Sequence, residues 1–270
     1  MAALLDRSIS QPYRSGRSAL RLHLCELPSP PAPAVVDRPS PIPDQPSSPV
    51  LPSPAAGAGT ATPDFWQKLW TDPKSEELKA QALSTLFVSG VGLGTLDPRI
   101  FGKYTVQDAV YCAKIAHLWF NLSNNSNADE YLQDLARVLS RKYRDIATEM
   151  LQWWQIQSDE SNEHFGVWLG DHATEYVKMV EGSLEKNPAY MLVPTFACLK
   201  LWPFLASTLE PKQPSNNIYA FWIEEHKQEG SSIKLVQKAI NLYAEKLDYA
   251  TALQLFHKGL QCEINFFTKP

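Results

Sequence analysis

AYMLVPTFACLKLWPFL (residues 189–205) carries apolar side chains on nearly every face of a helix. A helix that is apolar all round is buried on all sides, so this stretch predicts the central helix of a helical bundle. Pro194 and Pro203 each remove one backbone hydrogen bond, and we therefore expect the helix to be kinked or interrupted. Cys198 lies between the two prolines. A buried cysteine is most often an inert small apolar residue, so this thiol is a site candidate only if other polar groups face it.

The segments on both sides of this stretch show the three- and four-residue apolar spacing of helices. Helix-start signals precede several of them, such as Asp97 followed by Pro98. One segment, SEELKAQALSTLFVSGVG (residues 75–92), is expected to form a single helix from a serine to its glycines. We expect eight or nine helices with short connections over residues 64–268, without alternating strands. The sequence therefore predicts an all-α bundle.

The N-terminal part of the chain has a different composition. A dozen of the 21 prolines lie between Pro28 and Pro63, a stretch with few donors and little apolar mass. We expect residues 1–62 to form a disordered arm, first rich in serine and arginine and then in proline, ahead of one helical domain over residues 63–270. The first 25 residues hold four arginines and one acid. This composition is typical of an organellar transit peptide and equally of an unstructured tail.

Composition and charge exclude several classes of function. The net charge of −4 offers no electrostatic attraction for nucleic acid or for an anionic membrane. No uninterrupted apolar run approaches the roughly 20 residues of a membrane span. The four cysteines are scattered, without metal-ligand spacing or the density of a disulfide framework. We expect a reducing, cytoplasmic location, with mitochondria or plastids as the alternative if the arm is a transit peptide.

Two carboxylates stand among apolar residues. Tyr104, Asp108, Tyr111 and Cys112 share one face of a helix because they are spaced by three to four residues. Glu263 lies one turn ahead of a pair of phenylalanines on an otherwise apolar stripe. Burying an ionised carboxylate is unfavourable unless it is paired, so each acid either faces solvent or is held inside for a purpose.

Four segments carry recognisable motifs: FVSGVGLGTLDPRIFGKYTVQDAVY (87–111), FACLKLWPFLASTL (196–209), YAFWIEEH (219–226) and FHKGLQCEINFF (256–267). Their content and order resemble the TenA/thiaminase II family. The resemblance spans nearly all of residues 64–267, although residues 124–165 contribute little to it. It implies the haem oxygenase-like all-α fold, which the PqqC oxidases share.

The resemblance also implies a reaction and a site. The reaction is hydrolysis of thiamin, or of an aminopyrimidine formed by its breakdown, to hydroxymethylpyrimidine, in thiamin salvage, without a metal or cofactor. Cys198 would be the nucleophile and Glu263 the acid/base. The residues expected to bind the substrate are Asp108, Tyr111, Tyr176, Trp202 and His226. A small-molecule substrate and a homo-oligomer are the implied partners, with no nucleic acid and no membrane.

The chain departs from the family pattern at three positions. Leu93 replaces an acid, while Trp202 and His226 stand where tyrosines are usual, which removes hydroxyl groups that orient the substrate. Two other functions therefore stay open: an oxidoreductase like haem oxygenase or PqqC, and a binding or interaction protein without catalysis. His117 and the later histidines give no clear proximal ligand for haem.

Overall fold

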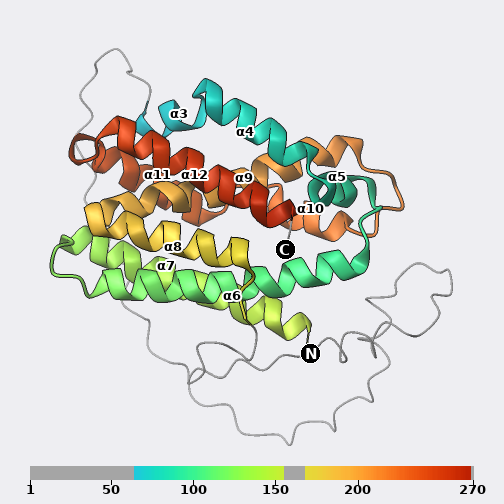
Figure 1. Cartoon of the computed structure of the whole chain (residues 1–270), viewed down its shortest axis with the longest axis horizontal. Coiled ribbons are helices and arrows are strands. Elements are labelled where there is room, and N and C mark those ends of the chain that lie inside the picture. Colours follow the sequence, from blue (N-terminus) through green and yellow to red (C-terminus); the bar gives the residue numbers. More distant parts are fainter. Residues whose placement is uncertain (1–63, 155–167, 269–270) are drawn as a thin grey trace, which may run out of the picture. The chain divides into compact units, whose positions relative to one another are not determined.

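The computed structural model describes residues 64–154 and 168–268, and within these ranges the chain is helical. Figure 1 shows the arrangement of the helices. The ten α-helices are α3 (Phe65–Trp70), α4 (Pro73–Ser84), α5 (Leu86–Leu93), α6 (Pro98–Ser123), α7 (Glu130–Trp153), α8 (Asp171–Lys186), α9 (Leu192–Leu209), α10 (Ala220–His226), α11 (Ser231–Leu242) and α12 (Tyr249–Thr268). Three short 3₁₀ turns are η1 (Pro188–Met191), η2 (Glu210–Lys212) and η3 (Ala244–Lys246). The all-α prediction is confirmed, and the expected disordered arm lies outside the described residues.

The single helix predicted over residues 75–92 is wrong, because two helices occupy it. The first helix, α4, begins at Pro73, and Asp72 caps it by accepting a hydrogen bond from a backbone amide. Ser75, the predicted start, is buried inside this helix. The chain leaves helical geometry at Thr85, with φ −61° and ψ 147°, and the Thr85 side chain caps α5.

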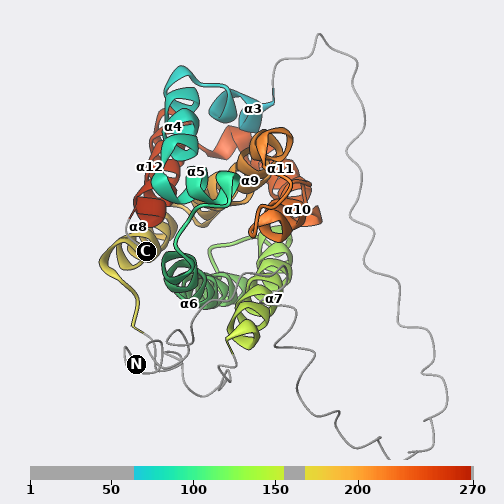
Figure 2. The same ribbon diagram turned by 90° about the vertical axis from the view of Figure 1, so that its right-hand side faces the viewer.

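The apolar helix α9 is central, as its sequence predicts. It packs against α12, α10 and α11, and Figure 2 shows it between α12 on one side and α10 and α11 on the other. Pro194 lies in its first turn, where the backbone amide needs no partner within the helix, whereas Pro203 lies inside the helix. By length and apolarity the segment Pro188–Lys212 could cross a membrane, yet most of it is buried within the bundle.

The remaining long helices pack around α9 in a way that brings distant segments together. Helices α6 and α7 form an antiparallel pair in contact along their length, α8 packs on α6 and α12, and α12 also packs on α4 (Figure 1). Five helices, α6 to α9 and α12, therefore border one region of the interior.

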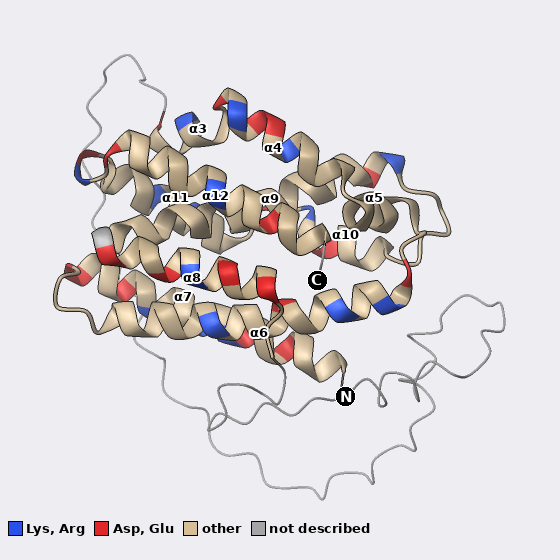
Figure 3. Cartoon of the chain, in the orientation of Figure 1, with Lys and Arg blue, Asp and Glu red and all other residues tan. Residues whose placement is uncertain are grey.

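Positions of basic and acidic residues are interspersed along the helices (Figure 3). Among the described residues with an acidic or basic side chain, Lys79 and Glu263 are buried. Lys79 is paired, since its ammonium lies 2.7 Å from Glu76 and 4.0 Å above the ring of Trp70. Glu263 has no basic partner of this kind, and its surroundings define the site described below.

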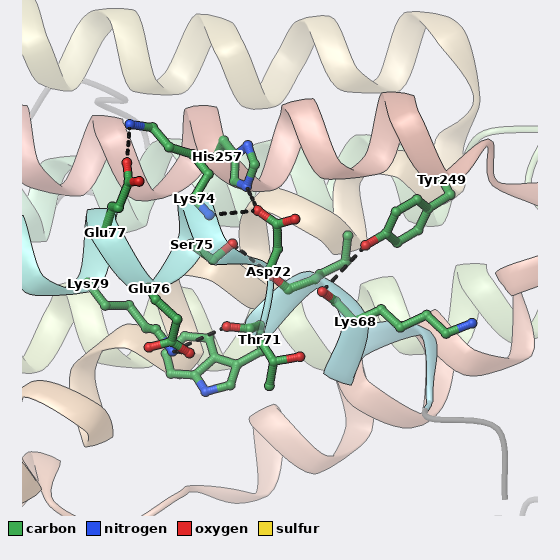
Figure 4. Close-up of polar contacts among 12 residues, drawn as sticks. Lys68, Thr71, Asp72, Lys74, Ser75, Glu76, Glu77, Lys79, Tyr249 and His257 are labelled. Carbon is green, nitrogen blue, oxygen red and sulfur yellow. Dashed lines mark hydrogen bonds and ion pairs between the residues drawn. The ribbon is translucent and has the colours of Figure 1, made fainter.

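The junction of α3 and α4 is fastened to α12 by polar contacts, drawn in Figure 4. Asp72 accepts a hydrogen bond from the backbone amide of Lys74, and the same carboxylate oxygen lies 3.0 Å from Nε2 of His257. Nearer the start of α12, the Tyr249 hydroxyl donates to the Lys68 carbonyl at 3.4 Å. These contacts help to fix the position of α12, which carries Glu263.

The end of α5 depends on a left-handed glycine. Gly94 caps α5 with φ 72°, and a Cβ atom there would lie 2.9 Å from Oδ1 of Asn217. The Asn217 amide donates to the carbonyls of Val91 and Gly92, so its side chain cannot move without losing buried hydrogen bonds.

We expect Gly94→Ala to lower the free energy of unfolding by about 1 to 3 kcal/mol, because it combines left-handed backbone strain with a contact against a fixed side chain. Gly182→Ala is the control, since a Cβ atom at this helical position meets open space. It should stabilise the chain by up to about 1 kcal/mol. Urea unfolding followed by circular dichroism measures both, and equal stability of Gly94→Ala and wild type would contradict the assignment.

Candidate functional site

Polar side chains from five helices meet in the interior, near enough for their charges to interact. We call this group the polar cluster. It comprises Tyr104, Asp108, Tyr111 and Cys112 from α6, Tyr143 from α7, Tyr176 from α8, Cys198 from α9 and Glu263 from α12. Helices that are far apart in the sequence thus contribute two carboxyl groups, two thiols and four phenols to one cluster.

Glu263 is at the centre of the cluster, with 2% of its surface exposed. The Tyr176 hydroxyl donates a hydrogen bond to Oε1 of Glu263 at 2.9 Å, and the Cys198 thiol lies close to the same carboxyl group. Burial raises the pKa of Glu263 to about 7, with a further contribution from the negative charge of Asp108. The carboxyl group is therefore poised to gain and lose a proton near neutral pH.

Asp108 is the second carboxyl group, and it is half-buried. The Tyr104 hydroxyl donates to Oδ2 of Asp108 at 3.3 Å, and the Cys112 thiol lies 3.9 Å from Oδ1. Both donors lie four residues from Asp108 on α6, so the helix periodicity alone places them. Burial raises the pKa of Asp108 to about 7 despite these two donors.

The two carboxyl groups influence each other's ionisation. Because a charge on Asp108 raises the pKa of Glu263, loss of the first proton from the pair makes loss of the second harder. Near neutral pH, one carboxyl group can therefore be ionised while the other keeps its proton. Such a pair offers a base and an acid within one site.

Cys198 has a neutral thiol in this environment. Its surface is 8% exposed, and burial raises its pKa well above the usual range, with the charge of Glu263 as the next cause. A thiol must lose its proton to act as a nucleophile. Glu263 is the carboxyl group with the largest effect on this thiol, so it is the group placed to take that proton.

Aromatic rings border the carboxyl groups. The ring centroids of Tyr111 and Tyr176 lie 4.7 Å apart with planes 30° apart, and the ring of Phe266 lies 6.2 Å from that of Tyr111. Flat rings at these separations are a suitable surface for another flat ring. The sequence candidates Asp108, Tyr111, Tyr176, Cys198 and Glu263 are thus neighbours.

Trp202 and His226 lie one layer further out. The ring of Trp202 lies 5.9 Å from that of Tyr104, whose hydroxyl reaches Asp108. His226 lies 5.2 Å from Trp202 and stacks on Trp222 at 4.6 Å, and no contact joins it to the carboxyl groups. Burial lowers the pKa of His226, which favours the neutral imidazole near pH 7. Leu93 is 58% exposed and takes no part in the cluster.

Sequence reasoning missed three members of the cluster as site residues. Tyr104 and Cys112 were placed on the face of Asp108 but were given no role. Tyr143 was not singled out, since its segment carries little of the family resemblance. The sequence feature that could have identified Tyr143 is its position on the apolar stripe of α7, four residues after Leu139 and four residues before Ala147. Within the described ranges, no three His, Cys, Asp or Glu side chains gather in a way that would hold a metal ion.

The raised pKa of Glu263 predicts a pH-dependent stability. The folded protein holds this proton more tightly than the unfolded chain does, so the stabilisation is complete below about pH 4.5 and is lost as the pH rises through about 7. The total change attributable to Glu263 is about 3 kcal/mol.

Glu263→Gln should remove this part of the pH dependence. The difference in unfolding free energy between the wild type and this variant, measured in urea between about pH 5 and pH 8, should fall steadily with rising pH. Tyr176→Phe tests the same carboxyl group, because loss of its donor should raise the pKa of Glu263 further. A difference that does not change with pH would show that Glu263 titrates normally.

No family model and no curated protein sequence matches the chain. Several solved structures match its fold. A TenA homologue from P. horikoshii OT3 superposes with a TM-score of 0.60 at 18% identity, covering 76% of this chain and 96% of that one. A TenA homologue from Pyrococcus furiosus gives 0.60 at 16% identity, covering 75% and 98%.

A third structure is described as a TenA family transcription regulator from Silicibacter sp. TM1040. It superposes with a TM-score of 0.57 at 16% identity, covering 75% of this chain and 94% of that one. At these identities the likeness concerns the fold. The described helices of this chain therefore have the TenA-like, haem oxygenase-like fold that the resemblance predicted.

Proposed function

We propose that the protein is a hydrolase that acts on an aminopyrimidine, either thiamin or a product of its breakdown, and releases hydroxymethylpyrimidine. One observation carries the proposal. The thiol of Cys198 lies close to the buried carboxyl group of Glu263, and a second carboxyl group, Asp108, lies in the same cluster. The TenA-like fold supports the class of substrate.

The polar cluster does little to stabilise the fold, and this favours a functional role for it. Two carboxyl groups, one buried and one half-buried, whose pKa values are raised to about 7 are unfavourable in their charged forms, and apolar side chains of similar size would fill the space without that penalty. Groups whose pKa values lie near neutrality are suited to move protons at working pH. The composition of the cluster is therefore best explained by chemistry.

Substrate binding would use Asp108 and the phenols of Tyr111 and Tyr176, whose rings are tilted against each other. An ionised Asp108 accepts charge-assisted hydrogen bonds from an amino group and a protonated ring nitrogen, which a 4-aminopyrimidine presents side by side. Tyr111 and Tyr176 offer their faces to the flat ring. These interactions orient one ring edge toward α6 and leave a ring carbon for Cys198.

In the first step, the Cys198 sulfur forms a bond to a ring carbon, and its proton passes to ionised Glu263. The ring electrons move onto the adjacent ring nitrogen. That electron pair then returns through the ring and expels the substituent from the exocyclic carbon, while Glu263 donates the proton to the departing group. Glu263 thus acts first as a base and then as an acid.

In the second step, water adds to the exocyclic methylene carbon and the carbon–sulfur bond breaks. The ring regains its aromaticity, and the sulfur recovers a proton from the water. For an aminomethyl substrate the sum is amine plus water to alcohol plus ammonia, without an oxidant or a reductant. The Cys198 sulfur leaves the ring as a thiolate and takes up a proton at once, because burial holds the pKa of this thiol well above its usual range.

Trp202 and His226, which lie just outside the polar cluster, affect which substrate the protein would accept. Trp202 and His226 present no phenol hydroxyl, and both pack against aromatic neighbours rather than against the carboxyl groups. Fewer polar groups are then available for a large substituent. We therefore propose a smaller aminopyrimidine, in preference to thiamin itself.

Cys198→Ser should reduce turnover of 4-amino-5-aminomethylpyrimidine by at least about a thousandfold, because a hydroxyl is a far poorer nucleophile at neutral pH. Binding of the product should persist, as measured by calorimetry. Cys262→Ser is the matched control, since Cys262 is half-buried on the same helix as Glu263 and has no role in the mechanism. Turnover that survives Cys198→Ser would remove this thiol from the mechanism.

The two carboxyl groups should respond differently to loss of charge. Asp108→Asn should chiefly weaken binding of the aminopyrimidine, by about tenfold to a hundredfold, because the charge-assisted hydrogen bonds are lost. Glu263→Gln should instead lower kcat while the substrate still binds. Steady-state kinetics and calorimetry separate the two effects. Absence of binding by the wild type at millimolar concentration would favour a protein without this activity.

A further inference from the structure

Gly259 is a buried glycine in the middle of α12, where the lack of a side chain needs a reason. A glycine inside a helix is less favourable than an alanine, so at such a position it often marks the close approach of another element. The neighbour here is α9, which packs against α12. A Cβ atom on Gly259 would lie 2.9 Å from the Cβ atom of Ala197 and 3.4 Å from the Cα atom of Pro194.

This contact leaves no room for a single methyl group. Carbon atoms that are not bonded to each other pack at about 3.5 to 4.0 Å, so a methyl group on Gly259 would push α12 and α9 apart by about half an ångström or more. Neither neighbouring atom can swing aside, because the Cβ atom of Ala197 is attached directly to the backbone and the Cα atom of Pro194 is part of it. At Gly92, by contrast, the nearest atoms belong to the flexible end of the Leu209 side chain.

The contact lies next to the two groups that would exchange a proton. Ala197 directly precedes Cys198 on α9, and Gly259 precedes Glu263 by four residues on α12. Residues four apart lie on the same side of a helix, one turn from each other. A displacement of α12 at Gly259 therefore moves the Glu263 carboxyl group relative to the Cys198 thiol. The hydrogen bond from Tyr176 ties Glu263 to α8, so it does not set the separation of α9 and α12.

We propose that Gly259 is a positioning residue, which lets α12 approach α9 closely enough for the Glu263 carboxyl group to take the proton of Cys198. The inference rests on the proposed function and adds the contact that sets the distance between its base and its nucleophile. Proton transfer requires the two heavy atoms to be within hydrogen-bond reach. A misplacement of about 1 Å can slow a reaction about a hundredfold, so a methyl group at Gly259 should impair the first step. Asp108 lies on α6 and would still bind the ring.

Two variants test the proposal: Gly259→Ala adds a methyl group to the contact, and Gly259→Ala combined with Ala197→Gly moves the methyl group from α9 to α12. We expect Gly259→Ala to lower kcat for 4-amino-5-aminomethylpyrimidine about tenfold to a hundredfold, with little change in KM. Calorimetry should show that it still binds the product 4-amino-5-hydroxymethylpyrimidine as the wild type does. The double variant should recover most of the lost kcat, because the contact again holds one methyl group.

Gly182→Ala is the matched control for a glycine replaced inside a helix, since a Cβ atom there meets open space. It should keep wild-type kinetics. Unfolding in urea follows the contact without any need for activity. Gly259→Ala should have a lower midpoint than the wild type, and the double variant should return the midpoint close to the wild-type value, since the exchange leaves the helices with the same number of glycines and alanines.

The outcomes separate this inference from the proposed function. If the wild type turns over the substrate but Gly259→Ala has the same kcat, or if the double variant is as slow as Gly259→Ala, the role of Gly259 is wrong. If Gly259→Ala does not fold, the double variant decides alone: activity supports the role, and loss of activity contradicts it. If the wild type neither turns over the substrate nor binds the product, the proposed function fails and this role fails with it, even where the midpoints follow the contact.

Discussion

The buried carboxyl group of Glu263 is the constraint around which the interior is arranged. A carboxyl group with 2% exposure needs donors, and it receives a hydrogen bond from Tyr176 on α8, with the thiol of Cys198 on α9 close to it. These contacts require three helices to meet at fixed positions along their axes. The donors lower the pKa of Glu263 and burial raises it, and burial prevails, so the group titrates near neutrality. The fold thus encloses the Glu263 carboxyl group in its interior, where this group can gain and lose a proton.

The opposite side of the cluster is built by one antiparallel helix pair. On α6, Asp108 finds both of its donors four residues away, so this half of the site is nearly independent of the other helices. On α7, Tyr143 adds a buried phenol whose hydroxyl has no partner with hydrogen-bond geometry in the described part of the chain. The contacts within α6 hold the Asp108 carboxyl group in place, and the packing of the other helices brings Cys198 and Glu263 close to it.

Tyr104 connects the cluster to the aromatic layer outside it. Its hydroxyl donates to Asp108, while its ring contacts Trp202 and Phe266. Trp202 in turn contacts His226 and Trp222. A change of packing at these outer rings reaches Asp108 through Tyr104. Trp202 and His226 are thereby connected to Asp108 through ring contacts, although neither touches a carboxyl group.

Periodicity along the chain was enough to predict the all-α fold, the buried position of α9 and the shared face of Asp108, Tyr104 and Cys112. These features are local, because helix geometry fixes which residues share a face. The division of α4 from α5 at Thr85 was not foreseen, since the apolar pattern runs through it unbroken. The meeting of Cys198, Glu263 and Tyr176 was expected only through the resemblance to a family. Tyr143 was found only in the structure. Such contacts depend on how far each helix is rotated and shifted against its neighbours, and the packing of the whole core decides that rather than the spacing within any one helix.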